Sequence, residues 1–380
     1  MMRSEAKFNF ASLLSIKELI MKQIKLLLIL CVLILLASCR TTESTNSLNI
    51  TSESKDISSG KEFVSSQPIL KDNVNLSMSV FKGVTSIFSE DVINSAFKLS
   101  ENKITQYGVG PKESGYIITD EKCTVTVDEG MVSYLSSDVK EVLPVLQVFR
   151  YNETDQMYNA NQFEKDGDLN FKSHDEVLQD FYKILQAIGL ENNYLVNCYN
   201  LDSETLKEKE KVMIDKFGGN ENLDGWKDCY FLYAVPKLND KKVFTDVHGS
   251  SEKGTMITGE EIVSIVTEDG LQLLVVSNSV NIVEELEKKE IMTENQAKEE
   301  IERQLGQLIV SEQYTIKSIA LGYYPQFADT AHKEVLFYPA WKAVVLAEGD
   351  DTMRSSNDTA YSYEFSYMID AQTGLEISEE

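Results

Sequence analysis

The sequence predicts an α+β fold: tandem modules, each a helix followed by an antiparallel sheet, after an N-terminal signal and a flexible tether. Two segments begin with a capping box and continue with apolar residues at the 3.6-residue period of a helix buried on one face. Each is followed by several segments in which apolar and polar residues alternate, as they do in strands. The order of one helix and then several strands, seen twice, favours α+β modules over a parallel sheet with crossover helices.

Residues 1–38 are predicted to be a signal peptide, with Met21 as an alternative start of the chain. An apolar run from Leu26 to Ala37 follows Lys22 and Lys25. The run is shorter than the roughly 20 apolar residues that a membrane-spanning helix needs, and its basic start and small-residue end are typical of an export signal.

The signal ends in Leu36-Ala37-Ser38-Cys39, which resembles the lipobox of bacterial lipoproteins. The resemblance implies that Cys39 is lipidated with a diacylglyceride carrying acyl chains such as palmitate, and that it becomes the first residue of the mature chain. An uncleaved anchor and a plain secretory signal with an incidental cysteine are the alternatives. The lipobox predicts a protein held on the extracytoplasmic face of the cell membrane by its lipid.

Residues 39–67 are expected to comprise the lipidated cysteine and a flexible tether, because Ser, Thr and Asn dominate and few large apolar residues could offset the entropy of ordering. Loss of residues 1–38 removes five of 36 basic and two of 61 acidic residues, which leaves 31 and 59 and a net charge of −28. A surface this acidic repels nucleic acid and favours cations or basic partners. The alternative is that the negative charge only keeps the protein soluble.

The next region, residues 68–165, is expected to be an N-terminal α+β region. Two apolar segments, Cys123 to Val127 and Met131 to Leu135, alternate on either side of Asp128-Glu129-Gly130, and Tyr116 to Thr119 precedes them. This arrangement predicts a hairpin with a further strand beside it.

Residues 166–290 are expected to form the middle α+β module. Its helix begins at Ser173, with Glu176 completing a capping box, and ends at Gly189. A second helix is expected from about Ser203 to Phe217. The expected strands are Tyr194 to Tyr199, Asp228 to Val235, Glu261 to Thr267 and Leu271 to Val276. The Asp269-Gly270 pair predicts a hairpin between the last two.

Residues 291–380 are expected to form the C-terminal module. Its helix begins at the capping box of Thr293 and Gln296. Four apolar residues are expected to face inward from it: Ala297, Ile301, Leu305 and Leu308. The expected strands are Tyr314 to Tyr324, Val335 to Ala347 and Tyr361 to Ile369. In the last, Tyr361, Tyr363, Phe365, Tyr367 and Ile369 share one face, which predicts a strand packed on that face alone.

Three short motifs of this module carry a family resemblance. They are the helix opening Asn295-Gln296-Ala297, the strand from Tyr338 to Val344 with its Pro-Ala-Trp-Lys centre, and the closing segment from Met368 to Leu375. Together they resemble a PepSY-type domain and, more loosely, the YycH and YycI regulators of cell-wall signalling in Gram-positive bacteria. The resemblance implies a non-catalytic module that restrains or senses another protein of the cell envelope, and it brings no catalytic residues.

The expected function is therefore that of a membrane-anchored lipoprotein, a non-catalytic binding or regulatory module for an envelope protein or peptide. Four aromatic residues are candidates for the interaction surface, with core packing as the alternative: Tyr323, Tyr324, Tyr338 and Trp341. No metal site, and no cofactor other than the lipid on Cys39, is expected.

Two other classes of function remain open from the sequence. An envelope hydrolase would use Asp246, His248 and Ser250, which alternate and would share one face of a strand. A transporter-associated ligand-binding lipoprotein would need a deep cleft between domains. The cysteines at 123, 198 and 229 are expected to be buried thiols, with a Cys198–Cys229 disulfide as the alternative.

Overall fold

Antiparallel sheet dominates the chain. The computed structural model describes residues 76–99, 103–107, 115–139, 145, 163–190, 193–217, 227–245, 250–251, 254–255, 259–308, 312–328, 333–350 and 360–377. These residues belong to one compact unit of the chain, 61–380; 56% of them are in strands and 20% in helices. The expected signal peptide, lipobox and tether lie outside the described residues.

The larger of two main sheets has ten strands. In chain order they are β2 (Lys103–Tyr107), β3 (Gly115–Thr119), β4 (Cys123–Asp128), β5 (Met131–Ser136), β6 (Glu164–Lys165), β7 (Tyr194–Leu201), β8 (Cys229–Leu238), β9 (Lys241–Lys242), β12 (Glu261–Thr267) and β13 (Gly270–Ser277). Their order across the sheet is β2-β3-β4-β5-β13-β12-β8-β7-β6, with β9 beside β8, and every pairing is antiparallel. A small hairpin, β10 (Ser250–Ser251) with β11 (Gly254–Thr255), stands apart from it.

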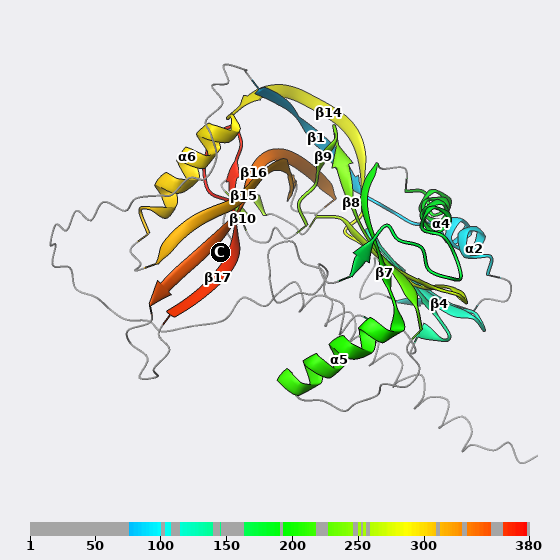
Figure 1. Ribbon diagram of the computed structural model, residues 1–380. Coiled ribbons are helices and arrows are strands. Elements are labelled where there is room, and N and C mark those ends of the chain that lie inside the picture. Colours follow the sequence, from blue (N-terminus) through cyan, green and yellow to red (C-terminus); the bar gives the residue numbers. More distant parts are fainter. Residues whose placement is uncertain are drawn as a thin grey trace, which may run out of the picture. The chain divides into compact units, whose positions relative to one another are not determined.

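The smaller sheet joins the two ends of the described chain. Its strands are β1 (Leu76–Thr85), β14 (Val280–Ile291), β15 (Gln313–Phe327), β16 (Glu334–Asp350) and β17 (Ala360–Asp370). Their order is β14-β1-β16-β15, and β17 also pairs with β16. In Figure 1, β1 and β14 run side by side as an arched ribbon, defined here as the arm.

The expectation of tandem helix-plus-sheet α+β modules is therefore wrong. Strands from the first and middle expected regions share the larger sheet. Strands β1 and β14 leave those regions and join the smaller sheet, where β14 pairs with β1 and β1 pairs with the C-terminal strand β16. The described chain has four helices for two large sheets, so helices are not the repeating unit. Alternation reports which face of a strand is buried, but it does not report which distant strand pairs with it.

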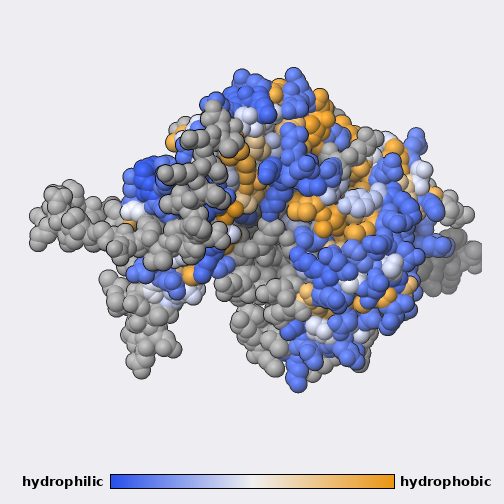
Figure 2. Space-filling model, turned by 45° about the horizontal axis from the view of Figure 1, so that its top comes forward, coloured by the Kyte–Doolittle hydropathy of each residue, from blue (hydrophilic) through white to orange (hydrophobic). Residues whose placement is uncertain are grey.

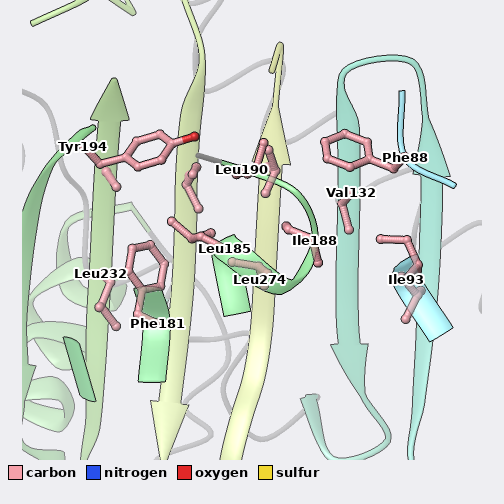
Figure 3. Packing of buried hydrophobic residues seen from close by; sticks show 14 of the residues in the cluster. Phe88, Ile93, Val132, Phe181, Leu185, Ile188, Leu190, Tyr194, Leu232 and Leu274 are labelled. Carbon is pink, nitrogen blue, oxygen red and sulfur yellow. The ribbon is translucent and has the colours of Figure 1, made fainter. Parts of the chain in front are cut away.

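Helices α2 (Glu90–Phe97) and α4 (His174–Ala187) cover one face of the larger sheet. The expected capping box of Ser173 and Glu176 is present, and Gly189 follows the helix at φ +88°. Figure 3 shows Phe181 and Leu185 of α4 packed against the sheet residues Leu232 and Leu274. This core confirms the helix and the face predicted from its apolar stripe.

Two further helices complete the described elements. Helix α5 (Ser203–Phe217) matches its predicted range, and the Asp202 carboxylate accepts a hydrogen bond from the Thr205 N–H at 2.8 Å. Helix α6 (Glu294–Leu305) has the predicted capping box of Thr293 and Gln296. Three of its four expected inward residues are buried, whereas Leu308 lies beyond the helix and is 46% exposed.

The last strand differs from its predicted one-sided burial. Helix α6 packs on the face that carries Tyr367 and Ile369, but Tyr361 and Tyr363, on the same face, are exposed. On the other face Met368 is buried against Phe244. The strand is buried on both faces where it nears its C-terminal end, because α6 covers one side there and the segment after β9 covers the other.

The cysteines are buried thiols, as expected. Cys123, Cys198 and Cys229 are all unpaired. Register explains the absence of the alternative disulfide, because Cys198 lies opposite Leu232, while Cys229 lies opposite Leu201. Burial raises the pKa of Cys123 to about 11 and of Cys198 to about 12, so these thiols stay protonated near neutral pH.

Candidate functional site

A fork in the smaller sheet creates the candidate site. Strand β1 pairs with β16 only through Phe81 to Val84, and the earlier half of β1 pairs with β14 alone. Along the same edge of β16, β17 takes over as the partner from Ala340 onward. The arm therefore diverges from the face formed by β15 and β16.

A groove with a volume of about 720 Å³ lies at this divergence. The arm, the start of α6, the strands β15 and β16 and the turn between β8 and β9 all contribute to it. Its lining residues are Leu76, Ser77, Met78, Ser79, Asn239, Lys241, Glu285, Lys288, Ile291, Thr293, Glu294, Ile319, Leu321, Tyr323 and Trp341. On the face shown in Figure 2, hydrophobic side chains form orange patches between hydrophilic (blue) surface.

The sheet side of the groove is apolar and follows from strand periodicity. Ile319, Leu321 and Tyr323 are two residues apart on β15, so they share one face. Trp341 pairs directly with Leu321 and is 5% exposed. The Trp341 indole donates to the Met292 carbonyl at 3.0 Å, which ties β16 to the short segment between β14 and α6.

Tyr323 is the least exposed residue of the lining, at 0%. Its ring meets Phe81 of β1 edge-on, with ring centroids 5.5 Å apart. Its hydroxyl has no hydrogen-bond partner within the described structure. Burial, with a smaller contribution from the Glu285 carboxylate, raises the pKa of Tyr323 to about 12, so the hydroxyl keeps its proton at physiological pH.

Charges at the groove are balanced. The Glu285 carboxylate on the arm accepts a hydrogen bond from the Ser79 hydroxyl at 2.6 Å. Glu294 opens α6, and two lysines, Lys241 and Lys288, complete the charged lining. Two acidic and two basic residues make the groove neutral within a strongly acidic chain, so it is unsuited to a ligand recognised mainly by its charge.

The structure divides the four predicted aromatic residues between two faces of the sheet. Tyr323 and Trp341 line the groove, whereas Tyr324 and Tyr338 stack on each other on the opposite face, with centroids 5.6 Å apart. Tyr324 is buried and donates to the Asp370 carboxylate at 3.2 Å. The four residues therefore do not form one platform, and Tyr324 contributes to packing.

The turn after β8 reaches the groove because the chain next crosses β15 very closely. The Phe244 N–H donates to the Tyr323 carbonyl at 2.8 Å. A Cβ at Gly322 would lie 2.6 Å from the Phe244 ring and 2.6 Å from the Lys242 carbonyl, so only glycine permits this approach. The crossing holds the segment that carries Lys241 beside β15.

The residues of the hydrolase alternative lie mostly outside the part of the chain that the structure describes. Asp246 and His248 lie outside the described residues, and Ser250 begins β10. Within the described ranges no group of three His, Cys, Asp or Glu residues could hold a metal ion. None of the helices in that part of the chain is long and apolar enough to cross a membrane.

Sequence reasoning missed the arm's side of the groove. Leu76 and Met78 come from β1, and Glu285 and Lys288 come from β14. Period-two alternation of Leu76, Met78 and Val80 could have indicated β1. No comparable signal exists in β14, where Glu284 and Glu285 are adjacent and both exposed.

No family model matches the sequence, and no curated protein matches it. The fold is similar to that of an uncharacterized protein from Eubacterium rectale, known from a crystal structure at 1.45 Å resolution. The two chains are 14% identical, with a TM-score of 0.56, and the match covers 80% of this chain and 87% of that chain. At this identity the likeness shows the fold alone.

Proposed function

We propose that this protein is a lipid-anchored lipoprotein of the extracytoplasmic face of the cell membrane, which binds and regulates an envelope protein without catalysing a reaction. The groove is the observation that carries the proposal. Its floor is apolar and includes Tyr323, whose buried hydroxyl has no partner in the described structure, and its charges cancel. Such a concave, largely apolar lining with a few polar groups is typical of binding sites.

Two other features support binding at the envelope. The lipobox-like Leu36-Ala37-Ser38-Cys39 would anchor the chain, and the acidic composition disfavours nucleic acid as a partner. The groove's lining contains neither His nor Cys, and the Ser79 hydroxyl is hydrogen-bonded to Glu285. The rest of the lining is largely aliphatic and aromatic, which suits recognition.

The anchor is tested by Cys39→Ala. We expect this variant to lose labelling by radioactive palmitate and to leave the membrane fraction or accumulate as a precursor, because a signal this short holds a bilayer poorly without lipid. Cys31→Ala, in the same signal, is the matched control and should keep both properties. Equal labelling of the two variants would contradict lipidation at Cys39.

Binding through the groove is tested by crosslinking on intact cells. A photoreactive amino acid at Ile319, on the groove floor, is expected to give one discrete adduct with an envelope protein. The control position is Ile87, which is 81% exposed and lies between β1 and α2, outside the groove lining. The same adducts from both positions, or none from Ile319, would count against the proposed function.

A further inference from the structure

Tyr323 contrasts with the other buried tyrosines of the described chain. Four of them donate their hydroxyl hydrogen to an oxygen of the protein: Tyr194 to Glu260 at 2.7 Å, Tyr230 to Lys172 at 2.7 Å, Tyr324 to Asp370 at 3.2 Å and Tyr367 to Gln304 at 2.8 Å. Tyr323 is as deeply buried, and its hydroxyl has no such partner. Folding therefore gives these four phenols an acceptor, and it gives Tyr323 none in the described structure.

Packing does not explain the hydroxyl at this position. The ring fills space beside Phe81, and a phenylalanine would fill the same space without a polar atom. A buried donor without a partner is unfavourable, whereas an apolar group of the same shape is tolerated. Because Tyr323 belongs to the groove lining, a ligand that displaces the side chains covering its hydroxyl can supply the acceptor.

The surrounding lining restricts the chemistry of that ligand. Leu76, Met78, Ile319 and Leu321 offer aliphatic contacts, and the charged lining residues sum to zero. An acyl chain would match the aliphatic walls, but its acceptor oxygens lie only at its carboxyl or ester end. An extended polypeptide with apolar side chains satisfies both requirements, because each of its residues carries a backbone carbonyl.

We infer that Tyr323 recognises an apolar, extended peptide segment in the groove by donating its hydroxyl hydrogen to a backbone carbonyl of that segment. This inference rests on the proposed function. It specifies which kind of segment of the partner binds in the groove and which hydrogen bond holds that segment. The aliphatic lining selects apolar side chains, and the hydroxyl fixes the depth at which the peptide lies.

The test uses the complete mature chain in detergent micelles and a library of acetylated, amidated octapeptides. We expect the bound peptides to be enriched in apolar residues. For the best binder, Tyr323→Phe should raise the Kd roughly 3- to 10-fold, the effect of one neutral hydrogen bond. Equal Kd values for wild type and variant would overturn the inference.

Tyr324→Phe is the matched control. It removes the same atom from the neighbouring residue of β15, on the opposite face, where the hydroxyl is bonded to Asp370. Its peptide affinity should equal that of the wild type. A loss equal to that of Tyr323→Phe would mean that both substitutions act through the sheet and would overturn direct recognition.

A second measurement changes the peptide. Each peptide bond of the best peptide is replaced in turn by a trans-alkene, which removes the carbonyl acceptor and the N–H donor but keeps the extended shape. For one analogue, the Kd with the wild-type protein should be about as high as the Kd of the parent peptide with Tyr323→Phe. With Tyr323→Phe itself, this analogue and the parent peptide should have equal Kd values. Uniform affinities across the analogues would overturn the inference.

A fluorescent fatty acid is measured in parallel. If the fatty acid binds in the groove and none of the octapeptides binds, the ligand is a lipid and the inference is overturned. An adduct at Ile319 in cells without octapeptide binding would mean that the partner docks through a folded surface. The proposed function would then stand although this inference had failed.

Discussion

Trp341→Ala is expected to lower the free energy of unfolding by about 3 to 5 kcal/mol, the usual cost of truncating a buried large aromatic residue. The indole is 5% exposed and packs in the cluster that contains Ile301 of α6 and Ile369 of β17. Its removal would also leave the Met292 carbonyl, at the entry to α6, without the indole N–H. A domain is stable by only about 5 to 15 kcal/mol, so the loss is a large fraction of the total.

Urea denaturation followed by far-UV circular dichroism measures this loss. The chain has two tryptophans, so removing one would distort a fluorescence signal. Leu308→Ala is the control, because Leu308 follows the same helix but is 46% exposed, and it should change stability by less than about 0.5 kcal/mol. Equal midpoints for the two variants would show that Trp341 is not a core residue.

Local sequence signals predicted the individual elements well. The capping boxes at Ser173 and Thr293 fix where α4 and α6 begin, because a side chain satisfies a backbone N–H at a set spacing. The hairpin at Gly270 was equally predictable, since its φ of +97° favours glycine. Each of these signals acts over a few residues.

The architecture was not predictable in the same way. Strand β1 pairs with β14 about 200 residues away, for example Leu76 with Ile291, and nothing local encodes that choice. The exposed charges of β14, such as Glu284 and Glu285, are typical of a strand at a sheet edge, and they remove the apolar alternation that marks a strand. The fork at β16, and with it the groove, depends on this pairing.

Two of the four predicted aromatic residues belong to the candidate site, and strand register decides which two. The aromatic cluster predicted a binding surface, and Tyr323 and Trp341 do line the groove. Tyr323 and Tyr324 are consecutive residues of one strand, so period two already places them on opposite faces. That signal was available in the sequence. The unpartnered hydroxyl, in contrast, is a property of the folded core alone.

Asp370→Ala is expected to lower the free energy of unfolding by about 3 kcal/mol, because hydrogen bonds to a charged group contribute roughly 1.5 to 3 kcal/mol and several are lost together. One carboxylate oxygen accepts from the backbone N–H groups of Gln372 and Thr373, at 3.0 and 2.9 Å, and holds the turn that ends at Gly374. The other accepts from the buried Tyr324 hydroxyl at 3.2 Å.

A double-mutant cycle with Tyr324→Phe, measured by urea denaturation, separates these two roles. In Asp370→Ala the Tyr324 hydroxyl is left buried without this acceptor, and that penalty disappears when the hydroxyl is also removed. The double variant should therefore be more stable than the sum of the single losses predicts. Strict additivity would show that the carboxylate acts on the turn alone. Tyr323→Phe, one residue away, should lose little or no stability, because folding gives its hydroxyl no partner in the described structure.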